Sequence, residues 1–242
     1  MNLDSTLPCI DIKYAQFPGF FSFGENFGKE NCLIPDDHFP WKPTRQPIYL
    51  EEWKINNESH SGKWSTIMQW ESYKDRVYNG QKFGTKSTSF EKFIDIPKKN
   101  SEEKFQLVIG NAPVDRLKSH GWEVVDFFEP SKSPWTYQNF IGNSKGEFTV
   151  AKHGYQVSNS GWFSERSLCY LAKGKPVITQ DTGFSQFIPT GNGLLVFQTE
   201  EEAISRVEEV NTNYSMHCKS ARTIAEDYFN SNKVLSDLLN AI

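Results

Sequence analysis

The feature that most constrains this chain is a regular alternation of β-rich and helical segments, which begins near residue 63. Six runs rich in β-branched and aromatic residues are predicted strands: residues 63–70, 105–110, 122–127, 147–152, 175–179 and 193–197. Strands separated by helices of about 10–15 residues usually pair in parallel. We therefore expect an α/β fold, with a doubly wound and mostly parallel Rossmann-like sheet.

Helical patterns fill most of the connections between these strands. The predicted helices are residues 90–97, 113–121, 135–144, 162–174, 199–210, 213–229 and 231–241. Pro113 suits the first turn of its helix, and Gly121 suits the end of that helix. A hairpin is expected at residues 77–84, because Asn79-Gly80 is a strong turn signal between aromatic residues.

The first 60 residues have a different texture from the rest of the chain. They are rich in proline, glycine and aromatic residues, and they show no sustained helical period. We expect a domain boundary near residue 60. Residues 1–60 would be an irregular connector or the remnant of an N-terminal domain, and residues 61–242 a Rossmann-like domain with C-terminal helices.

Charge, cysteine spacing and hydropathy exclude several classes of protein. The chain has 30 acidic and 26 basic residues, a net charge of −4, and no long basic tract, so nucleic acid is not an expected partner. Its four cysteines are widely spaced and form no metal motif. No apolar run reaches the ~18 residues of a membrane span. These features predict a reduced cytoplasmic protein with no metal, no other cofactor and no membrane span.

The candidate binding residues follow the carboxyl ends of the predicted strands, where a doubly wound sheet binds its ligand. Ser164 is a good N-cap for the helix that follows, and the free N–H groups of the first turn attract an anion. Arg166 can add donors to a phosphate, and Lys152 can neutralise a diphosphate. Glu165 would repel a phosphate, so we expect it to face a ribose or sugar hydroxyl.

A third loop adds Asp181, Thr182 and Gly183, whose amides and hydroxyl could hold a diphosphate or a sugar. Each signal has a purely structural alternative. Ser164 could simply cap a packed helix, Lys152 could be a solvated surface lysine, and the 181–183 loop could be an ordinary turn. The convergence of all three on one edge of one sheet favours a ligand site.

Residues 160–210 resemble the donor-binding segment of GT-B glycosyltransferases. In that segment a helix leads into a G-x-P-V-V strand, a D-x-G loop, a G-x-G-L-L-V strand and a helix that opens with acids. The matching pieces here are Gly174–Val177, Asp181–Gly183 and Gly191–Val196. The chain also resembles bacterial glycosyltransferase-like proteins with GEN, W-x-P-T and GEF-x-V-A-K segments, which stand here at residues 24–26, 41–44 and 146–152.

This resemblance implies transfer of a sugar from a nucleotide diphosphate sugar, such as a UDP sugar, to an unknown acceptor. It places Lys152, Ser164, Arg166, Thr182 and Gly183 at the diphosphate, and Glu165 and Asp181 at the ribose or sugar. Catalytic residues stay unassigned. Two glutamates that many retaining members carry are replaced here by Gly161 and Cys169, so the stereochemical outcome is open.

Members of the family also have an N-terminal Rossmann domain that binds the acceptor, and residues 1–60 are too short to form it. We therefore expect a missing N-terminal domain or a partner chain, and an apolar patch on the final helices. The alternative functions are a non-catalytic sugar- or nucleotide-binding module, one half of a heteromeric enzyme, and an epimerase or phosphatase-like enzyme on a similar sheet, because a fold does not fix a function.

Overall fold

The protein is built around a six-stranded sheet in which every pairing is parallel. This computed structural model describes residues 17–35, 37–55 and 61–242. The sheet strands are β3 (Trp64–Gln69), β6 (Phe105–Gly110), β7 (Glu123–Asp126), β8 (Gly146–Thr149), β9 (Val177–Gln180) and β10 (Leu194–Phe197). The predicted parallel α/β fold and its six strands are confirmed.

The strand order explains where a ligand can bind. The order is β10-β9-β8-β3-β6-β7, so the chain starts at β3, winds outward through β6 and β7, and then returns to the other side of β3 with β8. Winding direction therefore reverses between β3 and β8. In open α/β sheets this switch point leaves a crevice at the carboxyl ends of the two strands.

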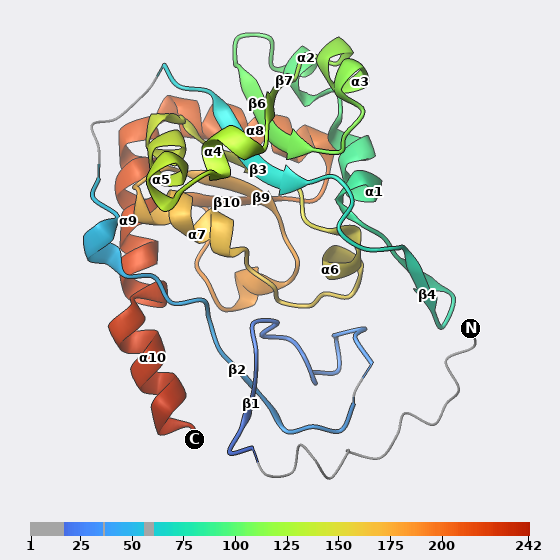
Figure 1. Ribbon diagram of the computed structural model, residues 1–242, viewed down its shortest axis with the longest axis vertical. Helices are drawn as coiled ribbons and strands as arrows, with labels where there is room; N and C mark the ends of the chain where they lie inside the picture. Colours follow the sequence, from blue (N-terminus) through green and yellow to red (C-terminus); the bar gives the residue numbers. More distant parts are fainter. Residues whose placement is uncertain (1–16, 36, 56–60) are drawn as a thin grey trace.

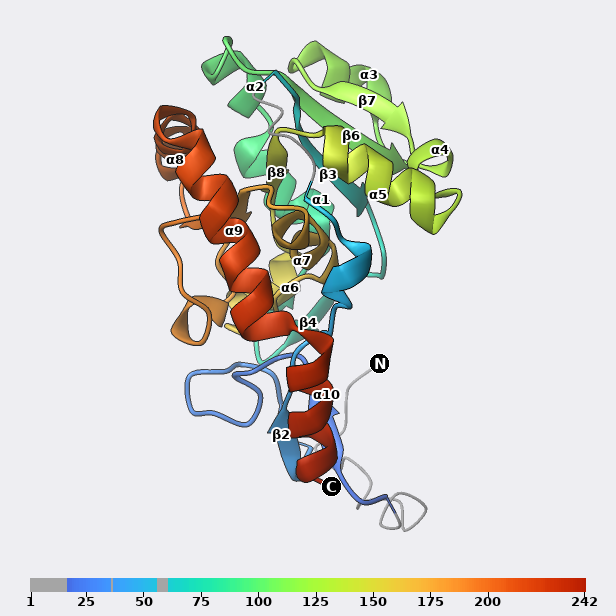
Figure 2. The same ribbon diagram turned by 90° about the vertical axis from the view of Figure 1, so that its left-hand side faces the viewer.

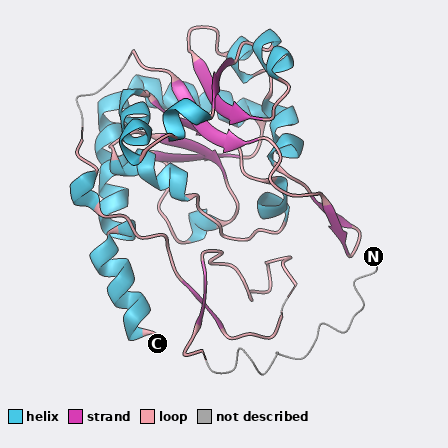
Figure 3. Ribbon diagram, in the orientation of Figure 1, coloured by secondary structure: helices cyan, strands magenta, loops and turns pink. Residues whose placement is uncertain are grey.

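Helices cover both faces of the sheet (Figures 1 and 3). They are α1 (Lys86–Phe90), α2 (Ile96–Lys99), α3 (Val114–Ser119), α4 (Phe128–Ser131), α5 (Pro134–Asn143), α6 (His153–Val157), α7 (Glu165–Ala172), α8 (Glu200–Thr212), α9 (Tyr214–Phe229) and α10 (Ser231–Asn240). Among the described residues, none of these helices combines the length and the apolarity needed to cross a bilayer.

The predicted helix over residues 90–97 is wrong in its extent. The segment is divided into α1, a 3-10 turn at Glu91–Phe93, and α2. Asp95 leaves the helical region with φ −90° and ψ 3°, and Pro97 then stands in the first turn of α2. A proline has no N–H to continue a preceding helix, but it is well suited to the first turn of a new one.

The core forms two clusters, one on each face of the sheet. Successive side chains of a strand point to opposite faces. Accordingly Val177 and Leu194 join the cluster with α7 and α9, whereas Ile178 and Leu195 join the cluster with α8. All four side chains are fully buried, and each such burial stabilises the fold by about 1.5–3 kcal/mol.

Residues 17–35 and 37–55, here called the N-terminal segment, contain a small sheet of their own. In it, β1 (Phe20–Ser22) pairs in parallel with β2 (Trp41–Pro43). It lies below the main sheet in Figure 1 and packs beside α10 in Figure 2. Isolated bridges join Gly24 to Trp162 and Ile48 to Asn230. The domain boundary near residue 60 stays a prediction.

The predicted hairpin is confirmed as β4 (Arg76–Tyr78) and β5 (Gln81–Phe83). Asn79 and Gly80 both have positive φ, at 49° and 76°. Two consecutive positive φ angles are the signature of a tight two-residue hairpin turn, which asparagine and glycine adopt readily.

Candidate functional site

A cavity of about 130 Å³ lies at the carboxyl ends of β8 and β9, beside the switch point of the sheet. Its lining is Lys86, Thr149–Lys152, Tyr155, Trp162–Arg166, Thr179, Gln180, Thr182 and Phe184. The structure thus brings five predicted site residues together: Lys152, Ser164, Glu165, Arg166 and Thr182. Asp181 and Gly183 lie in the adjoining loop, outside this lining.

Helix α7 begins at the cavity, as the sequence predicts. Ser164 takes the N-cap position with extended backbone, φ −82° and ψ 134°, but its hydroxyl makes no capping hydrogen bond. Glu165 is exposed in the first turn. The first N–H groups of a helix have no partner within the helix and carry the positive end of its dipole. The Ser164 hydroxyl and these amides are therefore available to an anion.

Arg166 lines the cavity while its guanidinium is held by the protein. Its Nε donates to Glu147, a carboxylate with 0% exposure on β8. One Nη donates to the Ile67 carbonyl and the other to the Thr149 hydroxyl, each at 3.1 Å. A carboxylate buried this deeply strongly destabilises the fold unless it is paired. Arg166 thus neutralises Glu147, and its direct contact with a phosphate stays a prediction.

Lys86 is a cavity residue that the sequence analysis missed. It is the first residue of α1 and is only 7% exposed, and its Nζ donates to the Thr149 hydroxyl at 3.0 Å. Desolvation lowers the pKa of Lys86 well below its ordinary value, and the positive charge of Arg166 lowers it further. A buried ammonium with a single hydroxyl acceptor is poorly solvated, so an incoming anion would stabilise it.

Lys152 is the third basic side chain at the cavity. It occupies the N-cap position of α6, and its Nζ lies 5.3 Å from the ring centroids of both Tyr73 and Tyr155. Burial is the main cause that lowers the pKa of Lys152. The two rings hold the ammonium by cation–π contacts and leave it beside the cavity. Glu147 already offsets the charge of Arg166, so Lys86 and Lys152 supply the excess positive charge beside this cavity.

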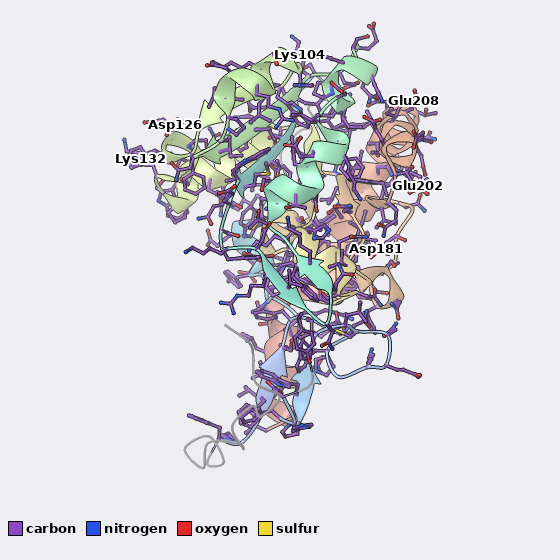
Figure 4. All side chains as sticks on the ribbon, turned by 90° about the vertical axis from the view of Figure 1, so that its right-hand side faces the viewer. Lys104, Asp126, Lys132, Asp181, Glu202 and Glu208 are labelled. Carbon is purple, nitrogen blue, oxygen red and sulfur yellow. The ribbon has the colours of Figure 1, made fainter. Side chains whose placement is uncertain are left out.

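The 181–183 loop is shaped by its own side chains. The Asp181 carboxylate accepts from the Gly183 amide at 2.8 Å and the Ser185 hydroxyl at 2.5 Å. The Thr182 hydroxyl donates to the Trp162 carbonyl at 2.6 Å. These groups already have protein partners, and their role toward a sugar or diphosphate stays a prediction. Figure 4 shows Asp181 between α8, marked by Glu202, and the N-terminal segment below.

Position 183 needs glycine because of its backbone conformation and its close neighbours, and Gly183 does not line the cavity. Its φ is +94°, and a Cβ placed there would meet Asn159 Oδ1 at 2.1 Å and Asn26 Nδ2 at 2.6 Å. Asn26 comes from the N-terminal segment and is fully buried. The loop and the N-terminal segment therefore approach too closely for any side chain at position 183.

Cys169 stands where the resemblance expects a glutamate. Burial raises the pKa of its thiol to about 12. It therefore stays neutral and supplies no carboxylate. No cluster of three or more histidine, cysteine, aspartate or glutamate side chains that could hold a metal ion occurs in the described part of the chain.

Solved structures with a similar arrangement include glycosyltransferases. An alpha-glucosyltransferase in complex with UDP and a 13-mer DNA containing a HMU base has a TM-score of 0.63 at 10% identity, over 93% of this chain and 64% of that one. Anabaena HepE with UDP and glucose has a TM-score of 0.55 at 11% identity, over 84% and 57%. The chain has the fold of one Rossmann-like domain of a GT-B protein. The resemblance inferred from residues 160–210 is thereby confirmed at the level of the fold.

Sucrose-phosphate synthase from Thermosynechococcus elongatus has a TM-score of 0.54 at 13% identity, over 83% of this chain and 51% of that one. The chain thus spans between half and two thirds of these three structures. No family model and no curated protein sequence matches it. One neighbour was solved with DNA, so the comparison lends no support to the expectation that nucleic acid is not a partner.

Proposed function

We propose that this chain binds a nucleoside diphosphate sugar and forms the donor-binding part of a glycosyltransferase. The observation that carries the proposal is the convergence of Lys86, Lys152 and Arg166 with the N-terminus of α7 on one cavity at the switch point of the sheet. A diphosphate is the ligand class that best matches a concentration of positive charge and free amides at such a place. Glu165, at the cavity rim, would face the ribose or the sugar.

In the reaction, the bond between the anomeric carbon and a diphosphate oxygen breaks, and the same carbon bonds to the acceptor oxygen. The acceptor hydroxyl loses its proton, and the nucleoside diphosphate leaves with the bonding electrons. Negative charge therefore grows on the leaving oxygen. Lys86, Lys152 and the α7 amides would stabilise that charge, and Arg166 would add to the local potential while it stays bonded to Glu147.

UDP is the first nucleotide to test, because the alpha-glucosyltransferase and HepE were both solved with it. Those proteins are longer than this chain. We therefore retain the proposal that a further domain or a partner chain supplies much of the acceptor side. Exposed apolar side chains on the final helix, Leu235 and Leu239, offer it a surface. We also retain a cytoplasmic location, which agrees with the free thiols of Cys32 and Cys169.

The test is a thermal-shift panel of UDP, GDP, ADP and dTDP and their sugars. A nucleotide at ~100 times its dissociation constant stabilises a folded protein by about 2.7 kcal/mol. We expect a shift with at least one diphosphate, reduced in Lys86→Met and retained in Lys104→Met. Lys104 is exposed just before the amino end of β6, far from Asp181 in Figure 4. No shift with any nucleotide at millimolar concentration would refute the donor site.

A further inference from the structure

A second cavity, of about 270 Å³, lies between the N-terminal segment and α10. Its walls include Phe21, Glu25 and Arg45 from the segment, and Tyr228, Asp237 and Leu238 from the C-terminal helices. It shares no lining residue with the first cavity. Figure 2 shows β2 running beside α10, and Lys42 donates to the Ala241 carbonyl across the two elements.

The charges around this second cavity are balanced. Two acids, Glu25 and Asp237, face two bases, Arg45 and Lys233. Glu25 and Arg45 form a two-pronged ion pair with distances of 2.7 and 2.9 Å, and their side chains are only 11% and 25% exposed. The second cavity therefore lacks the excess positive charge that suits the first to a diphosphate.

Rings and apolar side chains complete the lining. Phe21 and Tyr228 are half-buried, and Val234 is buried. The Arg45 guanidinium lies 5.5 Å from the centroid of the Tyr228 ring, which fixes both groups. Ligand sites commonly combine such apolar surface with a few fixed polar groups. A sugar ring matches this chemistry, since its C–H face packs on an aromatic ring while its hydroxyls bond to carboxylates and cations.

We propose that this second cavity binds an uncharged carbohydrate. Glu25 and Asp237 would accept hydrogen bonds from its hydroxyls, Lys233 would donate to them, and Tyr228 would contact a ring face. The balanced charge disfavours a phosphate, and the volume of about 270 Å³ suits a monosaccharide or one unit of a longer glycan.

A backbone bridge joins the segment that lines the second cavity to the lining of the first. Gly24 forms an antiparallel bridge with Trp162, and the Phe23 ring lies 5.9 Å from the Trp162 ring. Trp162 lines the first cavity, and Glu25, one residue beyond Gly24, lines the second. A carbohydrate in the second cavity would thus be the neighbour of the donor. Its assignment as the acceptor rests on the proposed function, whereas its binding does not.

The test is saturation-transfer-difference NMR with methyl glycosides of glucose, galactose, mannose and N-acetylglucosamine. We expect the unmodified protein to bind at least one of them. Leu238→Trp, which plugs the cavity, should weaken that binding by about tenfold or more. Leu239→Trp is the matched control, because its side chain is 68% exposed on the same helix and lies outside the lining.

Asp237→Ala is a second variant that removes an exposed cavity carboxylate without filling space. It should weaken binding about threefold to tenfold, as the loss of one hydrogen bond does. No binding of any glycoside to the unmodified protein, or equal binding to both tryptophan variants, would overturn the proposal. The UDP thermal shift, measured on the same samples, reports the donor site separately and should be unchanged in all three variants.

Discussion

Replacing Lys86 with methionine removes the most deeply buried cation of the donor cavity and keeps a side chain of similar length. The Lys86 ammonium donates to one hydroxyl, that of Thr149, and stands near the positive charge of Arg166. A bound diphosphate would give it a charged acceptor. Hydrogen bonds to charged groups contribute about 1.5–3 kcal/mol. Lys86→Met should therefore weaken UDP binding by about tenfold to a hundredfold.

The stability of the unliganded protein should change in the opposite direction. A lysine whose pKa is lowered by folding destabilises the folded state at any pH below the pKa that it has in the unfolded chain. This destabilisation is fully present below the folded-state pKa and disappears above the ordinary value of 10.5. Lys86→Met should thus be more stable than the unmodified protein at neutral pH, with a gain that shrinks as the pH approaches 10.5.

Binding and protonation of Lys86 should also be linked. A diphosphate favours the charged amine, so its affinity should fall as the pH rises through the lowered pKa of Lys86. Burial is the largest cause that lowers the pKa of Lys86; the charges of Arg166 and Lys152 lower it further, and those of Glu147 and Glu165 raise it. Isothermal titration calorimetry in buffers of different ionisation enthalpy measures the proton uptake, which Lys86→Met should reduce.

Two results would refute this reasoning. One is a UDP dissociation constant in Lys86→Met that lies within twofold of the unmodified value. The other is an equal loss of UDP affinity in Lys104→Met, which removes a charge at the amino end of β6, whereas the cavity lies at the carboxyl ends of the strands. Either result would show that the buried ammonium does not contact the ligand.

Three further predictions concern the loop, the counter-charge and the reaction. Gly183→Ala should lower the free energy of unfolding by more than about 1–3 kcal/mol, because the new Cβ clashes with Asn159 in addition to the strain of positive φ. Gly28→Ala is the control, since it has the strain but no atom within 4 Å of the new Cβ. Urea denaturation compares the two variants. The UDP thermal shift should survive EDTA, since side-chain cations neutralise the diphosphate; its loss would contradict this. The chain alone should bind donor without sugar transfer in a radiolabel assay, and robust transfer would remove the need for a partner.

The sheet could be predicted because its strands are buried on both faces and carry continuous apolar runs such as residues 105–110 and 193–197. The position of the site followed from the fold, since loops after parallel strands meet at one edge. The short helices were the elements that the sequence predicted least well. Helix α6 has only five residues, too few for a periodic signal, and Pro97 divides a segment predicted as one helix.

The parts of the site that were missed depend on tertiary contacts. Lys86 follows β3 only after a hairpin excursion of 16 residues, 70–85, so nothing in the local pattern links it to the loop after β8. The partner of Arg166 was likewise hidden, because the sequence alone does not show that the strand carrying Glu147 is buried. Lys86 and Glu147 are both charged residues at buried positions. Such residues point to a functional site only once the sheet is known and their burial can be seen.

The N-terminal segment connects the two proposed sites, although its sequence looks like an irregular connector. Its Asn26 is fully buried and donates to the Asn159 carbonyl at 2.9 Å, and the Gln46 amide donates to the Phe163 carbonyl at 2.9 Å. These bonds fix the wall between a cavity rich in positive charge and a cavity of balanced charge. A diphosphate would avoid the second cavity and a neutral sugar would gain little from the cations of the first, so the electrostatic difference alone would sort donor from acceptor. The segment therefore has a physical reason to be folded against the loops after β8 and β9, because it lines the second cavity and, through Gln46, holds Phe163 in the lining of the first.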